Sequence, residues 1–208
     1  MLAAPAPLSP SRPLLAPALQ EWVACCLALL SGRLLLVVRK GGIHERQGGG
    51  FALAHQRFAL LPTREHQRSA RLRPEFAALD PGLPPRPGTL EVAGWAEAAG
   101  VWQVRELPQL LALGNELAHT DEELAARFRY RGEPWLFVVA LRVHRLAAVQ
   151  CVPDLPRYAG CVSWVDLEPG IDPAGGRPVL ASEDFAARLA GIARILGGPN
   201  APGPGGGT

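Results

Sequence analysis

Apolar residues recur along the chain in short runs, and several of these runs alternate with polar residues. The clearest lies between Trp135 and Leu146, where β-branched and aromatic residues predominate and Arg142 and His144 occupy alternate positions. Such a run is typical of a strand with one face in a core. The same pattern predicts shorter strands at 51–53, 57–61, 90–95, 101–104 and 162–167.

The most apolar region, residues 21–40, has two interpretations. Two runs rich in Val, Leu and Ala flank Ser31 and Gly32, which predicts a β-hairpin whose second strand is 33–39. A helix over 18–30 is the alternative, because Ala and Leu dominate that stretch. We favour the hairpin.

Three segments have the spacing or the end signals of helices. Thr120 and Glu123 form a T-x-x-E capping box at the start of one of them. Ser182 is the predicted N-cap of the last helix, and Gly197 terminates it. The predicted helices are 107–113, 121–128 and 183–196.

Short strands with a few scattered helices predict an α+β fold with a mainly antiparallel sheet, open or barrel-like, and a few flanking helices. Gly and Pro make up 44 of the 208 residues and concentrate in three places. We therefore predict a flexible Pro-rich arm over 1–16, a single α+β domain over 17–196 and a disordered Gly/Pro tail over 197–208. Two lobes joined at the proline-rich segment 80–88 are the alternative to a uniform domain.

Composition narrows the class of protein. The four cysteines include no Cys-x-x-Cys pair, so we expect a reduced, cytoplasmic chain. The longest apolar region is interrupted at Ser31-Gly32-Arg33, short of the roughly 20 residues of a spanning helix. The N-terminus lacks the basic segment of a signal peptide. We predict no membrane contact and no cofactor, and the sequence does not determine the oligomeric state.

Basic residues gather in one part of the chain. Between Arg33 and Arg73 there are nine Lys and Arg residues and two acids, a local net charge of +7 in a chain whose total is +2. A cluster of this kind attracts phosphates whatever the base sequence. A solvated arginine-rich face in an arginine-biased protein is the alternative, since 20 of the 21 basic residues are arginine.

Two motifs in this cluster indicate an anion site. Arg39 and Lys40 precede two glycines, so that backbone N–H groups and two cations can surround one anion, although a tight turn explains the glycines equally well. The second motif is Pro-Thr-x-x-His-Gln at 62–67, where Thr63 is the predicted N-cap of a helix starting at Arg64.

Histidines and one cysteine suggest catalytic alternatives. His44, His55 and His66 follow one another at intervals of eleven residues, but equal spacing across turns does not define a zinc site, and we predict no metal. Cys161 is a candidate nucleophile if a histidine lowers its pKa, and a small buried thiol otherwise.

Several motifs follow one another in a fixed order along the chain. They are Glu21-Trp22, Arg39-Lys40-Gly41-Gly42-Ile43 with Glu45, His55-x-x-Phe58-x-Leu60-x-Pro62-Thr63-x-x-His66-Gln67, and Arg142 followed by Tyr158-x-Gly160-Cys161-x-Ser163-Trp164. This ordered series resembles the bacterial domain-of-unknown-function 1802 family over residues 18–168. The resemblance implies no reaction, cofactor or catalytic residue. Leu61 stands where we expect an aromatic residue before Pro62.

These observations favour a nucleic-acid-associated protein whose partner is a nucleic acid or nucleotide. Its phosphates would lie on the basic strand end and the Pro-Thr turn, and Tyr158 or Trp164 would stack a base. The candidate ligand-binding residues are Arg39, Lys40, Gly41, Gly42, His55, Thr63, His66, Gln67, Arg142, Tyr158 and Trp164.

Two further hypotheses remain open, so the sequence does not decide whether the chain is an enzyme. One is a metal-dependent phosphodiesterase or nuclease using Glu21, Glu45 and Lys40, or a thiol enzyme using Cys161 and His66. The other is a non-catalytic scaffold or interaction module, in which Glu21, Arg39 and Arg142 form a buried polar network.

Overall fold

The structure is a computed structural model that describes residues 13–40, 44–47, 50–82, 86–160 and 162–199. Its strands are β1 (Leu15–Trp22), β2 (Leu36–Arg39), β3 (His44–Gln47), β4 (Gly50–Leu53), β5 (Arg57–Thr63), β6 (Thr89–Val104), β7 (Leu136–Pro153), β8 (Trp164–Ile171) and β9 (Arg177–Pro178). Its α-helices are α1 (Val23–Leu30), α2 (Pro74–Ala77), α3 (Leu107–Leu111), α4 (Asp121–Arg129) and α5 (Ser182–Leu196). Short 3-10 helices are η1 (Ser69–Arg71), η2 (Gly114–Glu116), η3 (Tyr130–Gly132) and η4 (Pro156–Tyr158).

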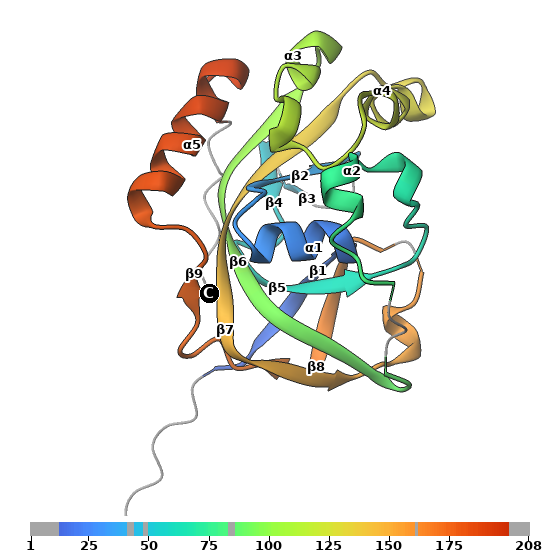
Figure 1. Cartoon of the computed structure of the whole chain (residues 1–208), viewed down its shortest axis with the longest axis vertical. Coiled ribbons are helices and arrows are strands. Elements are labelled where there is room, and N and C mark those ends of the chain that lie inside the picture. The colour runs from blue at the N-terminus through green and yellow to red at the C-terminus, as the bar shows by residue number, and fades with distance from the viewer. Residues whose placement is uncertain (1–12, 41–43, 48–49, 83–85, 161, 200–208) are drawn as a thin grey trace, which may run out of the picture.

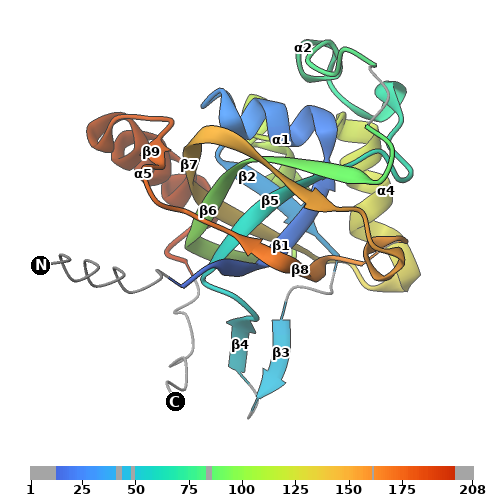
Figure 2. The ribbon, with the colours of Figure 1, turned by 90° about the horizontal axis from the view of Figure 1, so that it is seen from below.

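Seven strands form one sheet, and the α+β prediction is confirmed. Their order is β2-β7-β6-β5-β1-β8, with β9 added beside β7. All pairings are antiparallel except β1 with β5, which is parallel. The long strands β6 and β7 bend strongly (Figures 1 and 2). The barrel-like option is wrong, because the described strand path ends at β2 and β8 without closing.

The hairpin predicted over 21–40 is also wrong. The chain forms β1, then the helix α1, and returns through Gly32, which has a φ of 72°, to β2. The alternative helix over 18–30 is correct only from Val23 onward. Ala, Leu and Cys carry α1, whereas the preceding residues pair with β5, about forty residues further along the chain. Local composition does not reveal such a distant partner.

Three apolar cores fill the molecule. The first lies between α1 and the sheet face that bends around it (Figure 1). The second lies on the opposite face of β2 and β7, where α3, α4 and α5 pack. The third joins β1, β5 and β8 to the far parts of β6 and β7. Side chains of β6 and β7 contribute to all three cores, which explains why these strands are long and bent.

Most of the other predicted elements are present with shifted ends. The two strands predicted at 90–95 and 101–104 are one strand, β6, whose pairing with β7 shifts register near Gly94 and Gly100. The capping box of α4 is confirmed, since the Thr120 side chain accepts the Glu123 N–H. The N-cap of α5 is Ala181 rather than Ser182, which is already helical.

The described residues include parts of the predicted arm and of the segment predicted to join two lobes. β1 begins at Leu15, so the last two residues of the predicted arm are strand. β5 and β6 lie on either side of segment 80–88 and pair with each other. Residues 1–12 and 200–208 lie outside the described part. Among the described helices, none is both long and apolar enough to cross a membrane.

Candidate functional site

The ends of β1, β5 and β2 lie close together. They contribute side chains to the face of the sheet that packs against α1, which we call the inner face. Because β1 and β5 are parallel, they end at the same edge, where Glu21 pairs in register with Pro62. β2 ends nearby: Arg39 Nη2 lies 2.9 Å from Glu21 Oε2 and donates to the Gln20 carbonyl at 2.6 Å. The basic strand end and the Pro-Thr segment therefore both adjoin Glu21.

His55 and Trp164 lie on the same face. Leu19 pairs with Trp164, and Glu21 follows Leu19 by two residues, so these side chains point to one side of the sheet. The rings of His55 and Trp164 meet edge to face with centroids 5.0 Å apart. We call Gln20, Glu21, Arg39, His55 and Trp164 the strand-end cluster.

Two donors of the strand-end cluster are buried without a hydrogen-bond partner among the described residues. They are Arg39 Nε and Trp164 Nε1. The Arg39 side chain is 15% exposed and that of Glu21 is 7% exposed, so water does not readily replace a missing partner. Because buried polar groups are nearly always hydrogen-bonded, two such donors in one cluster require an explanation.

Tyr158 is buried next to the strand-end cluster, and its ring is not exposed to solvent or to a ligand. The side chain is 3% exposed, and its hydroxyl accepts the Glu168 N–H at 2.8 Å. Its carbonyl accepts a hydrogen bond from Gln20 Nε2, and the Gln20 N–H donates to the Ser163 carbonyl at 3.0 Å. The tyrosine thus fixes Gln20, and the ring is not available to stack a base.

Lys40 is held by backbone carbonyls. Its Nζ donates to the carbonyls of Phe128 and Trp135 at 2.9 Å each, and to that of Glu133. The ammonium also lies 4.6 Å from the Trp135 ring centroid. Burial lowers the pKa of Lys40, while Glu133 acts in the opposite direction. Lys40 therefore ties β2 to the end of α4. Gly41 and Gly42, which follow it, lie outside the described residues.

The Pro-Thr-x-x-His-Gln segment forms a turn, and the helix predicted from Arg64 is wrong. Thr63 Oγ1 accepts the Glu65 N–H at 3.1 Å, which closes the turn at the end of β5. His66 is exposed, has a φ of 57° and lies 3.3 Å from a Glu65 carboxylate oxygen. Its side chain makes no hydrogen bond, ion pair or ring contact with the strand-end cluster in the described part of the structure.

Gln67 has a structural position at the start of α1. Its Oε1 accepts the Ala24 N–H at 3.2 Å, and its Nε2 donates to Asp80 Oδ2 at 2.6 Å. Arg64 donates to the other Asp80 oxygen at 2.8 Å. Although burial acts to raise the pKa of Asp80, the hydrogen bonds from Gly82, Arg64 and Gln67 lower it overall. The motif thus joins the turn to α1 and to residue 80.

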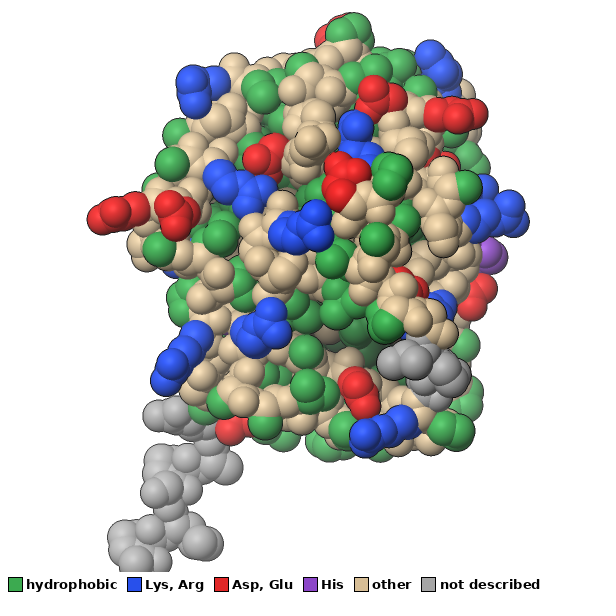
Figure 3. Space-filling view, viewed as in Figure 1, with side chains coloured by type: hydrophobic (Ala, Val, Ile, Leu, Met, Phe, Trp, Pro, Cys, Tyr) green, Lys and Arg blue, Asp and Glu red, His purple; other side chains and the backbone are tan. Residues whose placement is uncertain are grey.

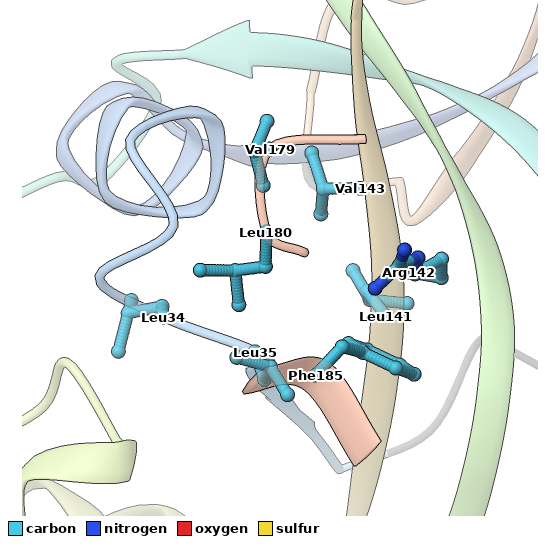
Figure 4. Close-up of a pocket in the computed structure, with 8 residues that line it drawn as sticks. All are labelled: Leu34, Leu35, Leu141, Arg142, Val143, Val179, Leu180 and Phe185. Atoms are coloured by element: carbon cyan, nitrogen blue, oxygen red, sulfur yellow. The ribbon is translucent and has the colours of Figure 1, made fainter. Parts of the chain in front are cut away.

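Arg142 lies apart from the strand-end cluster. Its guanidinium stacks on Phe185 at 4.6 Å and donates to Ala181 and Ser182 at the start of α5. Figure 4 shows it with Phe185 and Leu180 around a small hollow that apolar side chains otherwise line. The network predicted to join Arg142 with Glu21 and Arg39 does not form.

Carboxylates from outside the basic segment neutralise much of it. On the face in Figure 3, Lys and Arg side chains are interspersed with Asp and Glu. The pairs with carboxylates beyond residues 33–73 are Arg39–Glu21, Arg57–Glu97, Arg64–Asp80, Arg71–Glu123 and Arg73–Asp121. The +7 segment is therefore not a uniformly positive surface.

The catalytic alternatives gain no geometric support from the described residues. They contain no group of three or more His, Cys, Asp or Glu arranged to hold a metal ion. Lys40 faces carbonyls, and Cys161 and the Glu45 side chain lie outside the described part. Burial raises the pKa of Cys25 and Cys26, which disfavours their thiolate forms.

Sequence reasoning missed two buried polar residues, Gln20 in the strand-end cluster and His119 beside Trp22. His119 is 4% exposed and its ring lies 5.2 Å from that of Trp22. Burial, with Arg127 and Arg39, holds the pKa of His119 well below its ordinary value. The only available signal was the consecutive polar pair Gln20-Glu21 between Leu19 and Trp22, and such a pair resembles an ordinary exposed strand end.

Of the comparisons with known proteins, the match to a family model agrees with the motif series. The family described as "Domain of unknown function (DUF1802)" matches residues 18–191. A search of curated proteins finds no match. Solved structures of ASCH from Zymomonas mobilis are similar: a serine-to-alanine mutant protein has 16% identity, covers 85% of this chain and 94% of that chain, and has a TM-score of 0.38. The unsubstituted ASCH has 15% identity, coverages of 84% and 93%, and a TM-score of 0.37.

Proposed function

The chain belongs to the DUF1802 family, and on that premise we propose that it is a nucleic-acid-associated protein that binds a phosphate-bearing ligand at the strand-end cluster. One observation carries the proposal. Arg39 keeps a buried Nε–H without a partner in the described structure, while Glu21 and Gln20 occupy its Nη2. A phosphate oxygen is the acceptor that arginine commonly binds.

The ligand would bind as follows. A phosphate oxygen would accept the Arg39 Nε–H, and the neighbouring Trp164 Nε1–H is a second donor on the same face. The Gly41 and Gly42 amides remain proposed contacts, since they follow directly on Arg39 and Lys40. Lys40, Thr63, Gln67 and Tyr158 would act indirectly, by fixing the strands and turns around the site.

The Glu21–Arg39 ion pair also favours a second function, that of a non-catalytic scaffold. In that case the pair only stabilises the inner face of the sheet. The two functions differ in what happens when the pair is replaced as a unit by Glu21→Gln with Arg39→Met. This double substitution leaves no unpaired buried charge.

Binding to a fluorescent oligonucleotide of about 16 nucleotides, followed by anisotropy across a salt series, tests the proposal. We expect binding in low salt that weakens as salt rises. The double variant should bind at least about tenfold more weakly, because hydrogen bonds to charged groups contribute about 1.5–3 kcal/mol. Circular dichroism of both proteins confirms that the variant remains folded.

The matched control is the exposed pair Arg57–Glu97, which lies 3.4 Å apart and has the same composition. Glu97→Gln with Arg57→Met should leave the affinity within about threefold, as expected for a solvent-exposed pair. Absence of binding in low salt would refute the proposed function. Equal weakening by both double variants would show a general charge effect and favour the scaffold.

A further inference from the structure

The turn after α4 presents an aromatic ring between two cations. Arg129, Tyr130 and Arg131 are all exposed, and the tyrosine keeps 56% of its surface accessible. The Arg131 guanidinium lies 5.3 Å from the Tyr130 ring centroid. No described carboxylate lies within ion-pair distance of Arg129 or Arg131, unlike most arginines of the basic segment. We call residues 129–132 the α4–η3 turn.

The α4–η3 turn is held in place from beneath. Lys40 donates to the Phe128 carbonyl just before the turn and to the Glu133 carbonyl just after it. Within the turn, Arg131 has a φ of 61° and Gly132 a φ of 71°. A non-glycine residue in this region is strained, and such residues concentrate at functional sites. The exposed ring and cations therefore rest on a fixed backbone.

From these observations we infer that the α4–η3 turn binds an unpaired nucleic-acid strand, with Tyr130 stacking on a base and Arg129 and Arg131 contacting the flanking phosphates. Aromatic rings beside cations are the recurring means of binding single strands, whereas the bases of a duplex are already stacked and present no free face. The inference rests on the proposed function and extends it. Lys40 donates to carbonyls on both sides of the turn and follows Arg39 directly in sequence, which connects the turn to the end of β2.

The test compares the single-stranded oligonucleotide, as DNA and as RNA, with the DNA duplex of the same sequence. We expect the wild-type protein to prefer either single strand over the duplex. Tyr130→Ala should weaken single-strand binding about tenfold and leave duplex binding unchanged, because stacking on one base contributes about 1–3 kcal/mol. Tyr130→Phe keeps the ring and should bind like the wild type.

The charges are tested separately. Arg131→Ala should reduce the slope of log K against log salt by about 0.7, the value for one phosphate contact on a single strand. The control is Arg177→Ala in β9, an exposed arginine far from α4 (Figure 1), which should not change the slope. A wild-type preference for DNA or RNA identifies which strand the turn recognises.

The outcomes distinguish the two proposals. Wild-type protein that binds no oligonucleotide in low salt refutes both of them. Protein that binds, but whose Tyr130→Ala variant keeps the full single-strand affinity, refutes the inference and leaves the proposed function. Equal affinity for duplex and single strands refutes it in the same way. Loss of single-strand binding in Tyr130→Ala and its retention in Tyr130→Phe supports the inference.

Discussion

Lys40 and Arg39 are neighbours in the sequence, yet their environments give them different roles. Lys40 points toward the end of α4 and saturates its ammonium with three backbone carbonyls. A cation is favourable there, because the carbonyl end of a helix carries partial negative charge. Arg39 points to the inner face and keeps one unpartnered donor. The alternation of side chains along β2 separates them, so the basic pair does not form one double-charged site.

The residues of the strand-end cluster were partly predictable from the sequence. Arg39, His55 and Trp164 belong to motifs that sequence reasoning selected, and the structure places all three in the strand-end cluster. Gln67 was selected for ligand binding, but its amide satisfies the start of α1 and Asp80. A sequence shows which residue types are present, whereas the partner that uses up a donor depends on packing between distant elements.

His119 makes the stability of the protein dependent on pH. Its pKa in the folded state is well below 6.5, mainly because of burial and then because of Arg127 and Arg39. The unfolded chain therefore binds the proton more readily, and stability falls as pH drops below about 6.5. His119→Phe keeps an aromatic ring beside Trp22 and removes the titration.

Urea denaturation at several pH values between about 8 and 5 measures this effect. Below pH 6.5, protonation of His119 should lower the free energy of unfolding of the wild-type protein by up to about 1.4 kcal/mol per pH unit. The free energy of unfolding of the variant should fall less steeply. His144, whose pKa burial also lowers, contributes to the slope that both proteins share. An identical pH dependence in wild type and His119→Phe would contradict the prediction.

Elements with strong local signals were predicted best. The capping box located α4, and alternation located β5, β6 and β7, because these signals arise within the element itself. β1 and α1 were not separated, since their boundary at Trp22 depends on the parallel pairing with β5. A parallel partner that is separated from β1 by α1, β2, β3 and β4 leaves no local trace in composition.

Replacing a glycine by alanine should have opposite effects on the stability of the protein in β6 and in α5. In β6, a Cβ at Gly94 would lie 2.6 Å from the His144 carbonyl oxygen and 2.5 Å from Leu30 Cδ2. Gly94→Ala should therefore destabilise the protein by about 1–3 kcal/mol, as overpacking does. In α5, the nearest atom to a Cβ at Gly191 is Arg194 Nη2 at 3.7 Å. Gly191→Ala should stabilise by about 0.4–1 kcal/mol.

Urea denaturation of the two variants beside wild type decides this prediction. The same substitution should move the midpoint in opposite directions, so a general effect of adding a methyl group is excluded by design. If Gly94→Ala leaves the midpoint unchanged, the close approach of β6 to β7 and α1 is not as tight as the distances indicate.

At the scale of the whole molecule, the fold brings carboxylates from distant parts of the chain to the cations of the basic segment. Counting residues 33–73 gives +7, and the rest of the chain is −5, yet the fold pairs five of the nine cations with carboxylates from other parts of the chain. A count along the sequence could not show this, because every one of those pairs joins different elements or loops. Arg129 and Arg131, which have no carboxylate within ion-pair distance among the described residues, lie outside the basic segment.

The Glu21–Arg39 pair connects two strands, β1 and β2, that are not neighbours in the sheet. β2 is at one end of the strand order, and β7, β6 and β5 separate it from β1. Arg39 nevertheless reaches Glu21 and the Gln20 carbonyl across the inner face. Side-chain contacts thus join β1 and β2, which make no backbone pairing with each other.

Replacing either Glu21 or Arg39 alone should therefore lower the free energy of unfolding of the protein. Glu21→Gln leaves the buried Arg39 charge uncompensated and should cost about 3–5 kcal/mol, as should Arg39→Met. The double variant should cost clearly less than the sum of the two, since no charge remains unpaired. The free energies of unfolding of all four proteins form a double-mutant cycle that measures the coupling. Additive costs would mean that the pair does not join β1 to β2, and that each side chain contributes through its own neighbours alone.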